Sequence, residues 1–307
     1  MKKLIILGLI APLCLGLAQA LDDEHRGSHA SITMNSDSPN ENCTDQLRVN
    51  EAEFRANMRD EETKTIPNQP LTIKGEDNGG IAVSTWDSPE FSLKLCKQVA
   101  AADEATARKV LAETHLEING SQISVQVPKE DDFVLGTLIV VKAPRNATLD
   151  LHVQNGGVSL NNFTGTAEAH AQNGGISLRH SSGKLTAKAE NGGVSIKDCG
   201  GEVTAEVENG GLSIALPEHW DGKGLEAHAQ NGGLVISVPK TFNGGLEVAA
   251  LRETSLICRD DICSAGERSV EGGHKIFRMG GANPQVKAST ENGGIIIQER
   301  DHHRGEL

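Results

Sequence analysis

The chain has 307 residues, of which 42 are acidic and 29 are basic, so its formal net charge is -13. An acidic chain without a basic cluster repels nucleic acid and anionic lipid headgroups, which excludes both as expected partners. Tyr is absent, and the chain has only two Trp and six Phe beside 34 Gly. This composition disfavours an ordinary globular core and favours a thin structure filled with Ala, Val, Leu and Ile.

Residues 1–20 have the pattern of a bacterial secretory signal peptide. Lys2 and Lys3 precede an apolar run over 4–17, and Ala18-Gln19-Ala20 forms a small-x-small cleavage site. The run is too short for a membrane span, and no second long apolar run follows it. We therefore expect an exported protein without a membrane span that begins near Leu21 and resides in the periplasm, in the medium or on the cell surface. Loss of the two lysines leaves 27 basic against 42 acidic residues, a net charge of -15.

The next segments in chain order carry weak signals. Residues 21–65 are polar and acidic and predict a partly ordered lead-in. A first β-coil is expected around Asn78, and the stretches 91–96, 115–127 and 135–144 also have strand patterns. Between them, the Ala- and Glu-rich stretch near 101–114 predicts the one helix of the chain.

A seven-residue phrase then recurs every 18 residues: "QNGGVSL" begins at 154, "QNGGISL" at 172, "ENGGVSI" at 190 and "ENGGLSI" at 208. Apolar residues alternate with polar ones on both sides of each Asn-Gly-Gly, which is the period of half-buried strands. A fixed period of this length indicates a solenoid whose corner is the Asn-Gly-Gly. We expect the glycines to supply positive φ at the corners and the asparagines to stack as a structural ladder. The ladder asparagines are Asn155, Asn173, Asn191, Asn209, Asn231 and Asn292.

The pattern continues to 298 with one interruption. After the copy at Asn231, Leu246 is expected to begin the next coil, and an insertion near 251–280 separates it from the last copy around Asn292. A polar tail, 299–307, follows. The whole predicts a mainly β protein, a right-handed parallel β-solenoid (β-helix) of ~18-residue coils with one short helix, over 66–298. Its handedness follows from the usual chirality of parallel crossovers.

Five cysteines follow the expected cleavage site. In an oxidising compartment we expect disulfides between Cys258 and Cys263, which bracket a four-residue turn, and between Cys43 and Cys96, which would tie the lead-in to the first strands. Cys199 is left over. A cysteine zinc site is disfavoured, because the chain has no second close-spaced pair.

The chain resembles a known family at "VVKAPRNATLDLHVQNGGVSL" (140–160), in the G-x-L-x-A-x-A-x-N-G-G-V-S-I repetition through 214 and in "NGGIAVSTWDSPEFSLKLC" with the helix that follows it. These motifs are similar to those of the bacterial "putative adhesin" family, and the resemblance covers roughly residues 70–298. It implies a secreted or surface-exposed β-solenoid that takes part in surface binding, without naming a ligand.

One group of side chains could hold a metal. Asp150 and His152 lie five and three residues before Asn155, and Glu168 and His170 take the same places before Asn173. Stacked coils would bring two imidazoles and two carboxylates together, a ligand set that suits zinc or copper. The competing interpretation is a solvated face of mixed charge. We expect no organic cofactor.

Trp220 is the candidate for stacking on a ligand such as a sugar, because it lies in the enlarged return loop "PEHWDGKG". The alternative is that its ring covers the end of a core. No Ser-His-Asp spacing, H-E-x-x-H or phosphate loop occurs.

The leading hypothesis is therefore a non-enzymatic extracytoplasmic binding or adhesion module for an envelope or extracellular protein or glycan. The first alternative is a structural cell-envelope protein that self-associates through its coil ends. The second is a polysaccharide-active β-helix enzyme, which is disfavoured because no acid and base align in the repeats.

Overall fold

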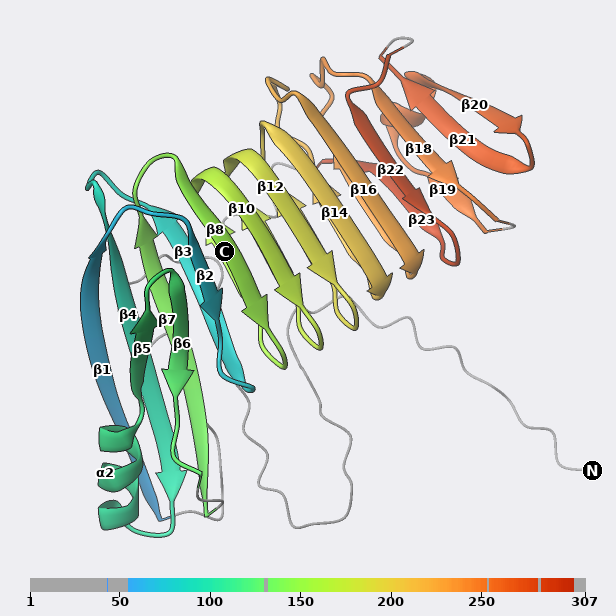
Figure 1. The fold of residues 1–307 in the computed structure, drawn as a ribbon. Coiled ribbons are helices and arrows are strands. Elements are labelled where there is room, and N and C mark those ends of the chain that lie inside the picture. The colour runs from blue at the N-terminus through green and yellow to red at the C-terminus, as the bar shows by residue number, and fades with distance from the viewer. Residues whose placement is uncertain (1–42, 44–54, 130–131, 253, 281–282, 301–307) are drawn as a thin grey trace, which may run out of the picture.

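The computed structural model describes Cys43 and residues 55–129, 132–252, 254–280 and 283–300. Over these residues the protein is mainly β, as predicted, and its strands form two large sheets with the hydrophobic core between them (Figure 1). The α-helix α2 (Glu104–Glu113) and the 3-10 helix η1 (Asp261–Ser264) accompany the sheets. The expected signal peptide and the tail from 301 onward lie outside the described residues, as does the lead-in up to 54 apart from Cys43.

Sheet A has 11 strands. In spatial order these are β1 (Ala56–Pro67), β4 (Glu90–Ala101), β7 (Phe133–Ala143), β3 (Gly79–Thr85), β9 (Val158–Asn161), β11 (Ile176–Arg179), β13 (Val194–Lys197), β15 (Leu212–Ala215), β17 (Leu234–Val238), β23 (Ile295–Glu299) and β19 (Leu256–Cys258).

Sheet B has 12 strands. In spatial order these are β20 (Gly266–Glu271), β21 (His274–Met279), β18 (Leu246–Ala250), β22 (Val286–Thr290), β16 (Gly224–Asn231), β14 (Glu202–Asn209), β12 (Ser182–Ala189), β10 (Thr164–Ala171), β8 (Ala147–Val153), β2 (Leu71–Lys74), β6 (Gln122–Gln126) and β5 (His115–Asn119).

The centre of each sheet is parallel and follows the sequence repeat. Ala169 of β10 lies between Leu151 and Ala187, 18 residues before and after it, and Ser177 of β11 lies between Ser159 and Ser195. Alternate side chains point inward, so the period of two in the sequence becomes one buried and one outward row per sheet. The ends of both sheets differ, because β1, β4 and β7, the pair β5–β6, and β18, β21 and β20 are antiparallel. The expectation of parallel pairing throughout was wrong for these segments, which lack the 18-residue repeat.

The six ladder asparagines form one chain of side-chain hydrogen bonds. Each amide nitrogen Nδ2 donates to the Oδ1 of the asparagine in the neighbouring coil, over distances from 2.8 to 3.2 Å. The chain runs through Asn155, Asn173, Asn191, Asn209, Asn231 and Asn292.

The Asn-Gly-Gly glycines have a different role from the expected one. Positive φ occurs at the return corners instead, at Asn162, His180 and Asp198 and at Gly183 and Gly201. The glycine that follows each ladder asparagine lies directly against the backbone of the neighbouring coil. A Cβ at Gly174, for example, would be 1.6 Å from the carbonyl oxygen of Gly156. Glycine is therefore required there for close approach of two backbones.

The last copy of the repeat is not at the end of the stack. Strand β22 pairs with β16 on one side and β18 on the other, and β23 lies between β17 and β19 (Figure 1). The C-terminal coil is thus inserted between two coils that precede it in sequence. The expectation that Leu246 begins the coil next to the Asn231 copy was wrong. Equivalent repeats offer equivalent edges, so sequence order does not determine spatial order.

Arg300 fastens this inserted coil. Its guanidinium bonds both carboxylate oxygens of Asp198, with Nη2 2.7 Å from Oδ2, and Nη1 donates to the Leu216 carbonyl at 2.7 Å. Its backbone N–H donates to the Val238 carbonyl at 3.0 Å. The side chains of Arg300 and Asp198 are only 19% and 20% exposed, and this contact raises the pKa of Arg300. One residue therefore connects the segment that follows β23 to three earlier corners.

The described part of the lead-in is more ordered than expected. Residues 56–65 belong to β1, which pairs along its whole length with β4. Helix α2 begins after Asp103, whose carboxylate accepts a hydrogen bond from the Thr106 N–H, and buries Val110 and Leu111. It is shorter than 101–114 because Ala101 ends β4.

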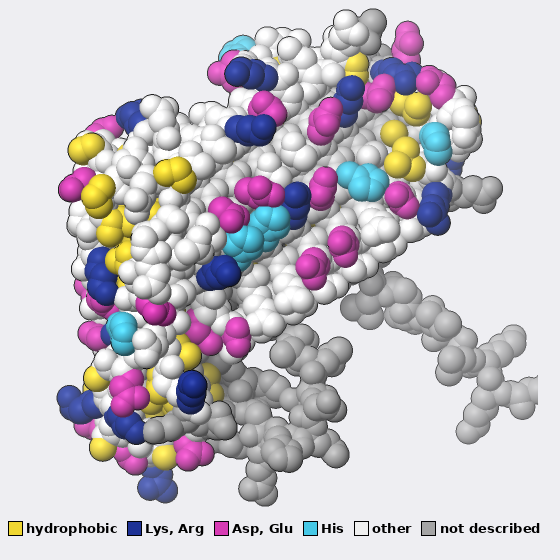
Figure 2. All heavy atoms as spheres, viewed as in Figure 1, with side chains coloured by type: hydrophobic (Ala, Val, Ile, Leu, Met, Phe, Trp, Pro, Cys, Tyr) yellow, Lys and Arg dark blue, Asp and Glu magenta, His cyan; other side chains and the backbone are white. Residues whose placement is uncertain are grey.

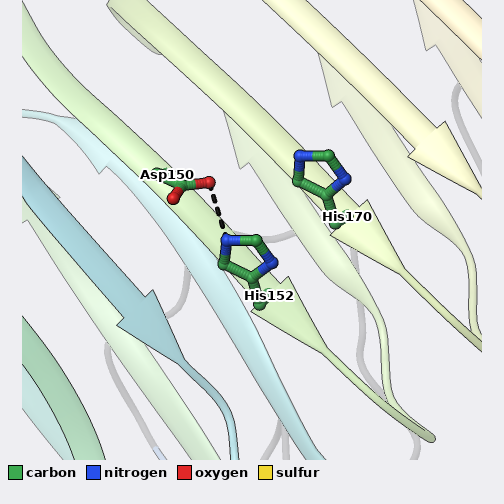
Figure 3. Close-up of side chains that lie close together, drawn as sticks. All are labelled: Asp150, His152 and His170. Atoms are coloured by element: carbon green, nitrogen blue, oxygen red, sulfur yellow. Dashed lines mark ion pairs between the residues drawn. The ribbon is translucent and has the colours of Figure 1, made fainter.

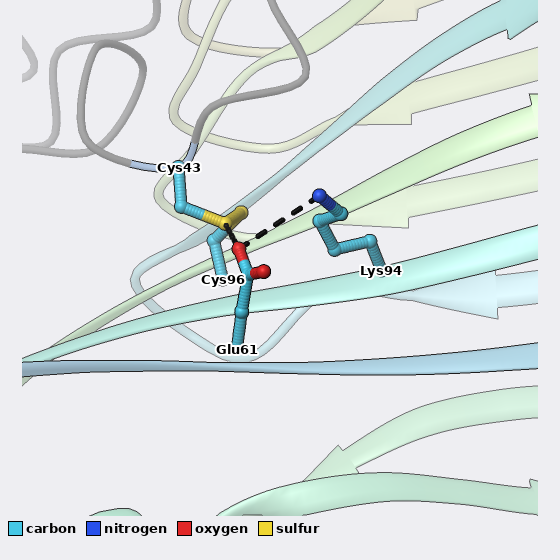
Figure 4. Close-up of a disulfide and its surroundings, with 4 residues drawn as sticks. All are labelled: Cys43, Glu61, Lys94 and Cys96. Atoms are coloured by element: carbon cyan, nitrogen blue, oxygen red, sulfur yellow. Dashed lines mark hydrogen bonds and ion pairs between the residues drawn. A yellow bond between two sulfur atoms is a disulfide. The ribbon is translucent and has the colours of Figure 1, made fainter.

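Two disulfides join the predicted pairs. Cys43 is bonded to Cys96 of β4, where Lys94 Nζ lies 3.7 Å from a carboxylate oxygen of Glu61 (Figure 4). Cys258 of β19 is bonded to Cys263 of η1. Cys199 is a free thiol in the core, and burial raises its pKa to about 11.

These assignments predict one thiol in protein that begins at Leu21. We expect a thiol reagent at pH 8 to find no rapidly reacting group in the folded protein, since Cys199 is buried and protonated there. After denaturation without reductant, we expect one thiol per chain. A count of five would contradict both disulfides.

Candidate metal centre

Outward-facing side chains of sheet B form rows that cross the strands. The register of β8, β10 and β12 places His152 beside His170 and His170 beside Lys188. Asp150 and Glu168 are neighbours in the adjacent row. Parallel strands are about 4.8 Å apart, so side chains in one row are in reach of each other. Figure 2 shows histidine, acidic and basic side chains gathered on this face.

Three of the four predicted metal ligands converge. One potential ligand atom each of Asp150, His152 and His170 lies within 4.8 Å of the other two. The imidazole rings are stacked with centroids 4.8 Å apart and planes 5° from parallel, and His152 Nε2 is 2.8 Å from Asp150 Oδ1 (Figure 3). No other group of three such ligands occurs within the described ranges. This group is the candidate metal centre.

Glu168, the fourth predicted ligand, lies outside the candidate metal centre. Its Oε1 is 3.0 Å from Lys188 Nζ and 3.0 Å from His170 Nε2. The hydrogen bond and charge of Lys188 lower the pKa of Glu168, although its partial burial opposes the shift. The same contact raises the pKa of Lys188. Glu168 is therefore ionised and positioned as a hydrogen-bond partner of His170.

The arrangement fits a divalent transition metal. Metal-bound histidines commonly hold their second ring nitrogen against a carboxylate, as His170 does through the contact of Nε2 with Glu168. Tetrahedral zinc takes nitrogen at about 2.0–2.1 Å, so the ligand atoms must approach one another on binding. Between 33% and 44% of each of the three side chains is exposed, which leaves them room to rotate. Three protein ligands leave a fourth position for another molecule.

A groove lies next to the candidate metal centre on the same face. It has a volume of 290 Å³, and Asp150 and Glu168 belong to its lining. Thr148, Thr166 and Lys184 form the row that lies seven residues before the asparagines, a regular spacing that the sequence alone does not mark as a site. The full lining is Pro70, Leu71, Thr72, Ser121, Thr148, Leu149, Asp150, Thr166, Ala167, Glu168, Lys184 and Thr186.

Trp220 does not present its ring to solvent. It is 6% exposed, belongs to the core and meets Phe242 edge-on, with ring centroids 6.4 Å apart. Its backbone N–H donates to Asn243 Oδ1 at 2.9 Å. The expectation that Trp220 stacks on a ligand was wrong, because the enlarged return loop folds the ring inward over the core.

The chain matches no protein-family model and no curated protein. Among solved structures it is similar to a "putative cell adhesion protein" from Clostridium sporogenes (12% identity, TM-score 0.31, 79% of this chain and all of that one). It is also similar to a "putative adhesin" from Bacteroides fragilis (10% identity, TM-score 0.31, 78% of this chain and 97% of that one). A third similar structure is a "putative lipid binding protein" from Parabacteroides distasonis (8% identity, TM-score 0.37, 78% of this chain and 97% of that one). Among the described residues, no helix has the length and hydrophobicity of a membrane span. Likenesses at these identities and TM-scores transfer no ligand and no site residue to this chain.

Proposed function

We propose that this chain is a non-enzymatic, exported binding module that holds a zinc or copper ion at Asp150, His152 and His170. The observation that carries the proposal is the convergence of these three side chains from two neighbouring strands. A ligand held in the metal's fourth position would connect the module to an envelope or extracellular protein or glycan.

We interpret the repeated coils as a right-handed parallel β-solenoid with antiparallel additions at both ends. The 18-residue parallel register and the asparagine chain support this interpretation. A rigid stack suits binding, since strand pairing on both sides of β8 and β10 holds the metal ligands in place. Export is supported by the two disulfides.

Self-association is the second candidate function. Strands β19 and β20 are the edges of the two sheets at the C-terminal end of the stack. Ile257 on β19 and Val270 on β20 are 45% and 71% exposed. An unpaired edge with exposed apolar side chains can pair with another chain, and sedimentation over a range of concentrations tests this.

Zinc titration by calorimetry tests the metal centre. We expect one zinc ion per chain, and we expect His152→Ala and His170→Ala each to weaken binding at least tenfold because each removes a ligand. Zinc affinity should also fall on acidification, since protons compete for the imidazoles.

The matched control is His228→Ala. His228 faces outward on the same sheet, but its partners are Ser289 and Glu291, and it is outside the candidate metal centre. Zinc binding that survives both His152→Ala and His170→Ala would overturn the proposal. An equal loss of zinc binding in all three variants would overturn it as well.

A further inference from the structure

The groove and the candidate metal centre have one residue in common. Asp150 lines the groove and also belongs to the metal set. Along β8, β10 and β12, the row of Thr148, Thr166 and Lys184 comes first, the row that holds Asp150 next, and the histidines last. An ion held by Asp150 and the histidines would therefore lie at one edge of the groove.

The lining of the groove suits a molecule rich in hydroxyl groups. Thr72, Thr148, Thr166 and Thr186 come from four neighbouring strands, and Ser121 joins the lining from the β5–β6 turn. Hydroxyl groups both donate and accept hydrogen bonds, as sugar hydroxyls do. The exposed Pro70 adds apolar surface beside them.

Bound metal would reverse the charge that the groove presents. The groove is lined by two carboxylates, of Asp150 and Glu168, and one ammonium group, of Lys184, which is a net charge of -1. A divalent ion changes this local sum to +1. Bound ions are often the largest charges in a site and decide which ligands it accepts. Without metal the groove disfavours an anion, and with metal it attracts one.

We propose that the groove binds a short acidic saccharide whose carboxylate takes the open position of the metal. Lys184 contacts the acidic groups, and the threonine hydroxyls bind the sugar hydroxyls. Lys184 is 64% exposed, and its one ion pair, with Glu202, is 3.7 Å long, so the ammonium can turn to a ligand. The volume of 290 Å³ is close to the lower limit of about 300 Å³ for small-molecule sites, which sets the size at one or two sugar units.

This proposal rests on the proposed function, and a galacturonate disaccharide distinguishes the two. We expect the disaccharide to bind zinc-loaded protein, freed of excess zinc, at least tenfold more tightly than it binds metal-free protein. The neutral galactose disaccharide should bind far more weakly than the acidic one. His170→Ala should lose both zinc and disaccharide, whereas Lys184→Ala should keep zinc and bind the disaccharide at least tenfold more weakly.

Threonine variants locate the hydroxyl contacts. Thr166→Val removes one hydroxyl from the groove and should weaken disaccharide binding several-fold. Thr204→Val is the matched control, because Thr204 continues the row beyond Thr186 but lies outside the groove lining. Zinc binding without disaccharide binding would overturn the groove proposal alone. Equal disaccharide binding with and without zinc would also overturn it. If the parent protein did not bind zinc at all, the proposed function itself would be overturned.

Discussion

Gly232→Ala is expected to destabilise the protein by at least about 3 kcal/mol. A Cβ at Gly232 would be 1.6 Å from the carbonyl oxygen of Gly210 and 2.5 Å from its carbonyl carbon. Both atoms belong to backbone that is hydrogen bonded within the stack, so the coils must separate locally to admit a methyl group. Denaturant unfolding of the variant and the parent measures the difference in free energy of unfolding.

Gly233→Ala is the matched control at the next position. The nearest heavy atom to a Cβ there is the Gly294 carbonyl oxygen at 3.6 Å, an ordinary contact. Since alanine restricts the unfolded chain more than glycine does, we expect a change between zero and a gain of about 1 kcal/mol. Similar effects at both positions would show that close backbone approach does not explain the repeated glycine.

Arg300→Met is expected to lower the free energy of unfolding by roughly 2–3 kcal/mol, somewhat less than the loss of one partner from a fully buried pair. Methionine keeps an unbranched apolar side chain but removes the charge. The variant would leave Asp198, which is 20% exposed, without its bidentate partner, and the Leu216 carbonyl would lose a donor. We also expect faster hydrogen exchange in β22 and β23, since Arg300 fastens this coil.

The control for Arg300 is an arginine–aspartate pair on the surface. Arg145 Nη2 is 2.7 Å from Asp87 Oδ1, but the two side chains are 67% and 84% exposed. Solvent screens such pairs, so Arg145→Met should change stability by less than about 1 kcal/mol. If the two variants had equal effects, or if exchange in β22 and β23 were unchanged, Arg300 would not be the fastening of the inserted coil.

The sequence predicted the repetitive part of the fold well. Alternation around Asn155 to Asn209 identifies the strands because each coil buries one side of every strand, and the fixed spacing of 18 residues sets the register. The order of the coils could not be predicted from the sequence, because the coil of Asn292 pairs in the same way with the edges of two earlier coils. The role of the glycines was also misjudged, since a close approach between coils leaves the same residue in the sequence as a positive φ does.

The candidate metal centre was predictable for the same reason as the strands. A parallel register converts the 18-residue separation of His152 and His170 into direct contact. The position of Glu168 outside the candidate metal centre was not predictable, because it depends on the ion pair that Glu168 forms with Lys188 in the next coil. Ser121 and Thr72 join the groove from strands outside the clean repeats, so no spacing in the sequence connects them to Thr148.

The inserted coil makes correct assembly of its two neighbouring coils depend on a segment that is synthesised after both of them. Until residues 286–299 arrive, β19 has no strand partner and β18 pairs only with β21. The upstream coil is equally incomplete, because β16 and β17 each lack a neighbour on that side. A chain without residues 286–299 would therefore expose one unpaired edge on each of four strands, and β22 and β23 cover these edges when the segment is present. Formation of these pairs thus requires residues that are synthesised later than all four of the strands they join.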